Sequence, residues 1–552
     1  MNAIGRFFKW VFGLLLKILL FILIISIGYG IYRYIVFTPM INGVAASETL
    51  VQQGYDSVNP RSYDPHQASA YNMNLLYSGL VALNAQSQVI PDLADRWEIN
   101  EDGTVYTFYL RENAKFHNGR KVLAQDIKYS LERSASQALN SPTSPTYLND
   151  IVGFDKFHTG ASNELWGVKV INDQTIEISI DAPKPYFLYK LTYPTAYILD
   201  KQNIDQGSEW YKTPNGTGPY KLKKWVPSKY WLYEVNHDFY LESAKIPYLM
   251  FNIVDEYSQD LYEKNQVDIA DVYSTERFMQ ESEPLHNELE AVNNMCTSFI
   301  YLDNTKPPFD DVHVRRAFTM AMNRTLFINK MYRGHAVPNT GVFPQGMPGF
   351  NMYLNYIPYD PAGAIKELGK SKYANTKIEV TVTDSGDGKY ASFQLAMLGQ
   401  MWKDTLGADI SVHNIEWDYY QEKINAGEHG ELFDYSWCAD YTDPENFADA
   451  LFHTGASQNR SHYSNPQLDK ILDAARVEQD VDKRISMYQE AERIIVDDAP
   501  VIFTAYPTDY YLVKPYLQGY TRTAITTTRE REISLSGKKW YLFKSSILDA
   551  LK

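Results

Sequence analysis

The sequence predicts an exported part built of mixed α/β lobes, preceded by one membrane-spanning helix. The run from Val11 to Tyr32 is apolar apart from Lys17. Helix-like and strand-like patterns then alternate over about 500 residues. Hydrophobic residues make up 45% and charged residues 22%, as in a folded globular chain. At about 150 residues per domain, the 552 residues allow three or four domains.

The first forty residues favour a membrane anchor. At about 1.5 Å per residue, the run 11–32 would extend roughly 33 Å, enough to cross a bilayer core. Arg6 and Lys9 precede it, which predicts a cytoplasmic N-terminus and a large domain in the periplasm or on the extracellular face. We therefore expect 1–40 to be a cytoplasmic stub and anchor of a single-pass protein in the cytoplasmic membrane. The alternative is a signal peptide cleaved near Val44-Ala45-Ala46, although the run is long for one.

Local patterns predict the first elements of the exported part. Alternating residues indicate strands at Thr104–Leu110 and Thr175–Ile180. Helical periodicity occurs in four stretches: 123–131, 312–331, 393–406 and 465–499. Asp310 is expected to precede the second of these helices, and Asn465, followed by Pro466, to cap the fourth.

Composition and motifs argue against several function classes. The 52 basic and 67 acidic residues leave a net charge of −15, which disfavours nucleic-acid binding. The sequence has no Gly-x-Ser-x-Gly elbow, no phosphate-binding lysine loop and no dinucleotide glycine pattern. None of the 11 histidines lies four residues from another, so we expect neither a metal site nor a cofactor. The sequence therefore predicts no enzyme.

Several separated stretches together resemble one family. They are Pro91–Trp97, Asp102–Phe108, Leu110–Gly119, Ala124–Ile127, Gly216–Tyr220, Lys306–Ala317, Pro344–Pro348 and Trp437–Pro444. In this order they resemble the solute-binding proteins of family 5, the peptide- and oligopeptide-binding components of ABC importers. The resemblance runs from about Glu48 to Tyr520, and the segment Thr521–Lys552 lies outside it.

The resemblance implies a two-lobed, periplasmic-binding-protein-like fold of class II with an extra inserted domain. The expected ranges are 48–83, 200–292 and 508–540 for lobe I, 84–199 for the inserted domain, and 293–507 for lobe II. Ligand would bind between the lobes, which close on it, because a ligand that contacts both lobes favours the closed state.

The implied function is a monomeric, membrane-anchored receptor that captures peptides, with oligopeptides favoured. It would pass them to an ABC permease driven by ATPase subunits, without covalent chemistry. One alternative keeps the fold and changes the cargo to a murein peptide, a nickel chelate, haem or an oligosaccharide. Another is a peptide sensor that serves no transporter.

The resemblance also places a substrate site in the Trp437–Asp440 stretch. Asp440 would hold the α-amino group of the peptide, as a charge-assisted hydrogen bond that reads no side chain. Trp437 and Tyr441 would line the cleft, and His429 resembles a histidine found near the pocket where a peptide carboxylate would be met. The alternatives are a turn or cap role for Asp440, core packing for the two aromatic residues, and a surface-loop position for His429.

Both cysteines lie at positions that, by the resemblance, form a disulfide in the oligopeptide-binding branch. An exported chain with Cys296 and Cys438 as its two cysteines also favours their pairing. The alternative is two free buried thiols. The chain departs from the branch before Trp437: the stretch Phe433–Ser436 has no Arg, the residue that can meet a peptide carboxylate there.

Overall fold

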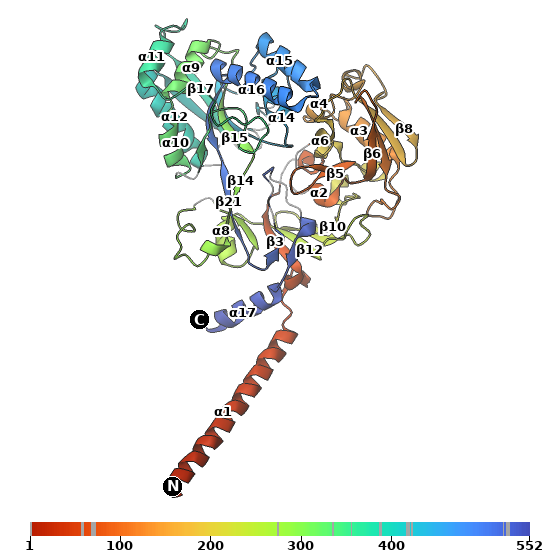
Figure 1. The fold of residues 1–552 in the computed structure, drawn as a ribbon, viewed down its shortest axis with the longest axis vertical. Coiled ribbons are helices and arrows are strands. Elements are labelled where there is room, and N and C mark those ends of the chain that lie inside the picture. Colours follow the sequence, from red (N-terminus) through yellow and green to blue (C-terminus); the bar gives the residue numbers. More distant parts are fainter. Residues whose placement is uncertain are drawn as a thin grey trace.

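The structure is a computed structural model that describes residues 3–551, except 57–59, 68–72, 273–274, 334–335, 355, 386–388, 416–419, 421–422, 425, 521, 523 and 526–529. Three α/β units form the body, and α1 (Ala3–Val36) projects from it as a separate rod (Figure 1). Among the described residues, Lys9–Val36 is the one helical stretch long and apolar enough to cross a membrane. Its side chains lie outside the body, with Leu19 63% exposed and Ile24 59% exposed.

Lobe I, the base of the body, contains two sheets. Its four-stranded sheet has the order β10 (Tyr220–Val226), β11 (Tyr230–Val235), β12 (Tyr248–Ile253) and β3 (Thr49–Gly54). Its three-stranded sheet has the order β13 (Ile269–Asp271), β21 (Thr508–Val513) and β14 (Leu289–Asn293). The helices α2 (Met73–Leu76), α7 (Lys201–Ile204) and α8 (Ser258–Glu263) accompany these sheets. Apolar side chains such as Leu50 and Met250 are buried beneath them.

Lobe II is built on a six-stranded sheet with helices on both faces. The order is β16 (Val337–Pro338), β20 (Val501–Tyr506), β15 (Cys296–Leu302), β19 (Leu432–Cys438), β17 (Glu379–Ser385) and β18 (Asp409–Ile415). The helices are α9 (Val312–Ala321), α10 (Arg324–Met331), α11 (Pro361–Leu368), α12 (Lys389–Leu406), α14 (Glu445–Phe452), α15 (Pro466–Val477) and α16 (Val481–Asp498). Phe299 and Ile300 alternate between two cores, as successive strand residues must.

Two strand-to-strand passages connect lobe I with lobe II. The chain rises from β14 into β15 and returns from β20 into β21. Thr508 donates a hydrogen bond to Asn293 at 3.0 Å beside these crossings, and Asn294 donates one to Asp509. Short paired crossings of this kind can act as a hinge, since few backbone torsions have to change.

The inserted unit has its own core and sheet. Its strands are β4 (Val81–Leu83) and β5 (Val89–Pro91), then a sheet of β6 (Ala94–Ile99), β7 (Val105–Leu110), β9 (Thr175–Ser179) and β8 (Val168–Asn172). Its helices are α3 (Ala124–Ala135), α4 (Ser144–Tyr147), α5 (Phe154–His158) and α6 (Phe187–Lys190). Phe108 and Ile127 are fully buried between sheet and helix.

Two stretches of predicted helical periodicity are helical, but each is divided into two helices. The stretch 312–331 is broken into α9 and α10, because Asn323 accepts a hydrogen bond from the Leu326 N–H and begins a new helix. The stretch 465–499 is likewise divided, with Asp480 accepting from the Lys483 N–H to begin α16.

The predicted caps have mixed outcomes. The side chain that caps α9 is Asp311, which accepts from the His313 N–H, whereas Asp310 pairs with Lys372 at 2.7 Å. The cap at Asn465 is confirmed: its side chain accepts from two backbone N–H groups, and Pro466 follows at the first helical position. The predicted strands over 104–110 and 175–180 are also confirmed.

The C-terminal segment returns to the base of the body. After the short strands β22 (Leu517–Gln518) and β23 (Ser534–Leu535), the chain ends in α17 (Lys538–Leu551). In Figure 1, α17 projects from lobe I on the side from which α1 leaves. The small strands β1 (Met40–Ile41) and β2 (Val44–Ala45) lie between α1 and lobe I.

Candidate functional site

Asp440 lies where lobe II meets the inserted unit. It follows β19, whose last residue, Cys438, is directly opposite Cys296 of β15. These two cysteines form a disulfide, which confirms their predicted pairing. The Ala439 N–H also donates to the Met295 carbonyl at 2.7 Å. The two residues just before Asp440 are therefore held to the start of β15, one by the disulfide and one by this hydrogen bond.

The Asp440 carboxylate receives hydrogen bonds from two side chains. The Tyr147 hydroxyl, at the end of α4 in the inserted unit, donates to Oδ2. The Asn446 amide, in α14, donates to the same oxygen at 3.3 Å, and its own carbonyl accepts from the Asp440 N–H at 2.9 Å. Asp440 thus joins two units that are far apart in the sequence.

The other acidic side chains at this interface are paired with cations. Asp150 lies 2.5 Å from Lys184 and 2.9 Å from Lys190. Lys190 also reaches across to Glu445 of lobe II at 3.4 Å. Among the described residues, no Lys or Arg forms an ion pair with Asp440. The interface therefore holds one carboxylate whose charge has no cation beside it.

Two further carboxylates, one just before α14 and one within it, are also neutralised. Arg484 forms a bidentate pair with Asp443, at 2.7 and 2.8 Å, and Arg476 forms one with Asp449, at 2.6 and 2.8 Å. Asp443 also accepts from the Glu445 N–H at 3.0 Å, so Asp443 is the residue that shapes the turn before α14. The carboxylate contacts of Asp440 are of a different kind, because they come from uncharged side chains, the Tyr147 hydroxyl and the Asn446 amide.

Burial raises the pKa of Asp440 to about 6 from its ordinary 3.8, and the hydrogen bonds from Tyr147 and Asn446 oppose this rise only in part. A carboxylate removed from water without a cation is costly in its charged form. A cation delivered to this position would supply the missing charge and form a charge-assisted hydrogen bond. The arrangement can thus bind an ammonium group.

Tyrosines of both units surround Asp440. Tyr147 stacks on Tyr193 with ring centroids 3.7 Å apart, and Tyr189 lies over Tyr441 at 6.1 Å. Tyr441 is fully buried, and its hydroxyl donates to Glu445. Sequence reasoning missed Tyr147 and its neighbours, because nothing local in 144–193 indicates that this segment meets residue 440.

Trp437 precedes the disulfide on β19 and is partly buried against the core of lobe II. Its indole Nε1 is buried and has no hydrogen-bond partner among the described residues. Trp437 and Tyr441 are both near Asp440 in the chain, but Tyr441 packs inward. A lining role for the two side chains stays a prediction.

His429 lies at the other end of β19 from Asp440. The seven-residue strand separates them by about 20 Å at 3.3 Å per residue. The structure therefore does not bring His429 beside Asp440. Its Nδ1 lies 2.9 Å from the Gly430 carbonyl, and burial lowers the pKa of its ring.

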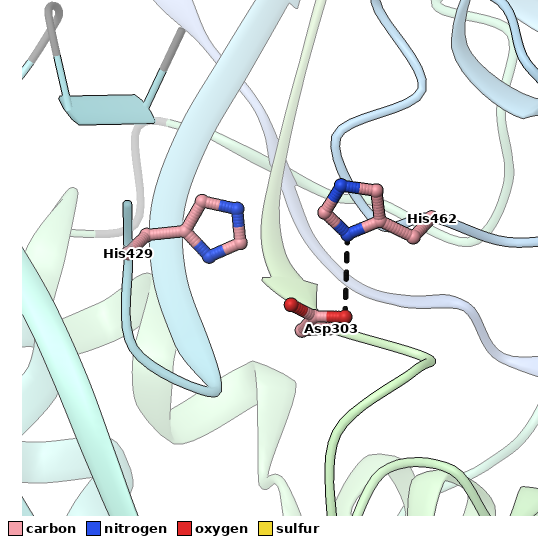
Figure 2. A group of neighbouring side chains, drawn as sticks. All are labelled: Asp303, His429 and His462. Atoms are coloured by element: carbon pink, nitrogen blue, oxygen red, sulfur yellow. Dashed lines mark hydrogen bonds and ion pairs between the residues drawn. The ribbon is translucent and has the colours of Figure 1, made fainter. Parts of the chain in front are cut away.

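At that end, His429 forms a group with Asp303 and His462 that could hold a metal ion. The nearest ligand atoms of the three side chains lie within 4.8 Å of one another, and Figure 2 shows them converging from three segments. Asp303, however, already accepts from Thr305 and lies 3.0 Å from the Lys306 ammonium. A divalent metal ion would have to compete with the Lys306 ammonium for the Asp303 carboxylate. This favours a structural role for the three side chains over metal binding.

Asp434 stands in the stretch where the resemblance led us to look for an Arg. Burial, and then the nearby Asp384, raise the pKa of Asp434 to about 7, and Gln394 donates to it at 3.1 Å. This part of β19 thus carries a carboxyl group, which offers no attraction to a peptide carboxylate.

Ligand binding through Asp440 is expected to depend on pH. A neighbouring ammonium would lower the pKa of Asp440 from about 6, so binding would release its proton at acidic pH. Affinity should therefore fall as the pH drops through 6, by about tenfold between pH 7 and pH 5. Isothermal titration calorimetry at several pH values would measure this change. Flat affinity over this range, with a ligand that has no group titrating there, would contradict the carboxylate's part in binding.

The raised pKa of Asp440 also has a consequence for the ligand-free chain. Because the folded state holds the proton more tightly than the unfolded chain, the contribution of this group to stability falls as the pH rises from about 4 to about 6.

Comparison with known proteins relates this geometry to a family. Residues 88–459 match the model of the bacterial extracellular solute-binding proteins, family 5. The periplasmic oligopeptide-binding protein OppA of Salmonella typhimurium is 29% identical over 516 residues, which cover 87% of this chain and 90% of that protein.

Solved structures confirm the predicted two-lobed fold. The Escherichia coli murein tripeptide binding protein MppA superposes with a TM-score of 0.79 at 26% identity, covering 88% of this chain and 98% of that one. Its unliganded open form gives a TM-score of 0.67 at 26% identity, covering 89% and 98%. The lobes of this chain are thus arranged more like those of the first MppA structure than like those of the open form. This agrees with the contacts between lobe II and the inserted unit at Asp440.

Proposed function

The chain belongs to the bacterial extracellular solute-binding proteins of family 5, and on this premise we propose that it captures peptides between its lobes and delivers them to an ABC importer. Members of this family are binding proteins of transporters and not enzymes. The proposal keeps the domain ranges predicted from the sequence, with lobe II at 293–507 and the inserted domain at 84–199, except that β4 (Val81–Leu83) is taken with the inserted domain because Val81 packs in its core. Oligopeptides are the favoured cargo, since the relative OppA is named for them.

One observation carries the peptide assignment. Asp440 is a desolvated carboxylate without a basic partner among the described residues, at an interface where Asp150 and Glu445 have one. A peptide's α-ammonium group supplies that charge and has three N–H donors. When the lobes open, Tyr147 would move away with the inserted unit and leave the Asp440 carboxylate free to bind the ligand. When the lobes close, Tyr147 would return beside Asp440.

The partner proteins follow from the same role. A binding protein without an ATPase cannot move its cargo, so a permease with ATPase subunits would take the peptide from the closed chain. The chain would act as a monomer, tethered by α1 with its lobes outside the cytoplasmic membrane. Support for the tether is the 28-residue helical stretch Lys9–Val36, which has no contact with the apolar cores of the lobes.

Native mass spectrometry of the full chain in nanodiscs tests the proposal. Peptides are expected to co-purify, to be lost on unfolding and refolding, and to rebind from a peptide mixture. A murein tripeptide belongs among the ligands offered, because the MppA structure resembles this chain. Recovery of a metal chelate, haem or an oligosaccharide in place of peptides would refute peptide capture.

The intact mass from the same experiment tests the tether. A chain that keeps its first residues through export is expected, because α1 is longer than the apolar core of a signal peptide. A mature N-terminus near Val44 would show that the helix is cleaved, and would leave the peptide assignment untouched.

A further inference from the structure

The two ends of the chain meet beside the outer end of α1. The Tyr34 ring contacts Trp540 at 5.6 Å and Phe543 at 5.5 Å between centroids, and Phe37 contacts Phe543 at 5.4 Å. The Lys539 ammonium donates to the Ile35 carbonyl at 3.3 Å. The helix α17 thus lies against the last turn of α1 and the residues just after it.

A buried ion pair fixes the start of α17 to lobe I. The Lys538 ammonium donates to Asp268 and to the Thr49 carbonyl, both at 2.5 Å. Asp268 also accepts from the Val51 N–H at 2.7 Å and from the Tyr516 hydroxyl. Because Lys538 is 3% exposed, this end of α17 is part of the body of the protein.

The next turns of α17 divide into different faces. Tyr541 faces lobe I, where its ring contacts Tyr516 at 4.9 Å and its hydroxyl donates to Asn265 at 3.2 Å. Trp540 and Phe543 face α1. Trp540 is nevertheless 56% exposed, and Ile547, one turn beyond Phe543 on the same side, is 39% exposed. Phe543 is 4% exposed, because Tyr34 and Phe37 cover it. Trp540 and Ile547 therefore form an apolar stripe on α17 that the described residues cover only in part.

The position of this stripe follows from the length of α1. From Val11 to Tyr32, about 33 Å of helix matches a hydrocarbon core of about 30 Å. Arg33 and Tyr34 then come at the outer headgroup region, which is where Tyr and Trp side chains are favoured in membrane proteins. Since Trp540 contacts Tyr34, α17 stands at the same level.

We propose that α17 is a second membrane contact, a helix that lies in the outer headgroup region of the lipid bilayer and orients the lobes above it. Its exposed apolar side chains, Trp540 and Ile547, would face the acyl boundary, with Lys539 and Lys544 near lipid phosphates. The inference rests on the proposed role of α1 as an uncleaved anchor. With α1 as the tether and α17 held to lobe I through Lys538, the body would keep one orientation toward a permease in the same membrane.

Lipid quenching of a fluorophore at position 547 tests this contact. The full chain with Ile547→Cys is labelled with an environment-sensitive dye, without reductant, so that the disulfide-bonded Cys296 and Cys438 stay unlabelled. In nanodiscs that contain lipids spin-labelled near the headgroup, the emission at 547 is expected to shift to shorter wavelength and to fall by more than about twofold. Nanodiscs with and without anionic lipid show how much the lysines contribute.

Two matched variants interpret the result. Val481→Cys, 72% exposed at the start of α16, reports on the surface of lobe II and should keep its emission. Ile24→Cys, in the middle of α1, should be quenched by lipids labelled deep in the acyl chain. Peptide binding by each labelled chain shows that it is folded.

The outcomes separate this inference from the proposals beneath it. If position 547 behaves like 481 while 24 is quenched, α1 is an anchor and α17 does not touch lipid. If 24 is not quenched, the anchor and the α17 contact both fail, while peptide binding stands or falls on its own measurement. If the emission of the dye at position 547 shifts to shorter wavelength only when a permease is present, the stripe binds protein and the lipid contact is refuted.

Discussion

Replacing Asp440 with Asn is expected to weaken the binding of peptides with a free α-amino group by about 100-fold, which is about 2.7 kcal/mol at 25 °C. The amide keeps the shape of the side chain and its hydrogen bonds to Tyr147 and Asn446, so the fold should survive. It removes the charge that the ammonium would meet at a poorly hydrated position. Calorimetric titration of the full chain with a peptide recovered from it would measure the loss.

Two controls separate a local contact from long-range attraction. Asp155→Asn removes the same charge from an exposed position of α5 and should change affinity by less than about twofold, since exposed charges are screened. An N-acetylated peptide should bind the wild-type chain weakly and lose little more with Asp440→Asn. If the acetylated and free peptides lose equally, Asp440 does not hold the amino group, and its role is in closure with Tyr147.

The sequence selects Asp440 as the candidate binding residue, but it does not reveal which side chains surround it. Its stretch of sequence resembles a family motif, and this is enough to select one aspartate among many. What makes that carboxylate distinctive is Tyr147, supplied from 293 residues away, together with the lack, in the part of the chain that the structure describes, of a cation such as Asp150 and Glu445 have. Those are tertiary contacts, which spacing within a single sequence cannot reveal.

Strand β19 shows that residues close in the sequence can also be far apart in the fold. The resemblance places His429 near the pocket for the peptide carboxylate and Asp440 at the amino end, and β19 between them is about 20 Å long. A binding role for His429 stays a prediction. By contrast, the disulfide was predictable, because both cysteines lie at positions that resemble a disulfide of the oligopeptide-binding branch and are the two cysteines of a chain expected to be exported. Helix boundaries were less predictable: the helical periodicity extended over 312–331, while α9 ends at Ala321 and Asn323 begins α10.

Removing the Cys296–Cys438 disulfide is expected to have the largest effect on stability. The bond closes a loop of 142 residues, for which the chain-entropy account gives up to about 5 kcal/mol. We expect Cys296→Ala with Cys438→Ala to lower the free energy of unfolding by about 2–5 kcal/mol. Because the loop lies within lobe II, the loss should concern the unfolding transition of that lobe. Urea unfolding of the full chain, followed by circular dichroism, would measure it.

Peptide affinity should respond much less than stability to this double substitution. Asp440 would still be held by the Ala439–Met295 hydrogen bond and by the pairing of β15 with β19, both formed in the folded state. Because the entropic account places the effect in the unfolded chain, the folded site should keep its geometry, and affinity should fall by less than about tenfold. Reduction of the wild-type chain should reproduce both results. If affinity instead falls as far as it does with Asp440→Asn while stability barely changes, the bond acts by positioning Asp440, and the loop-closure account is wrong for this protein.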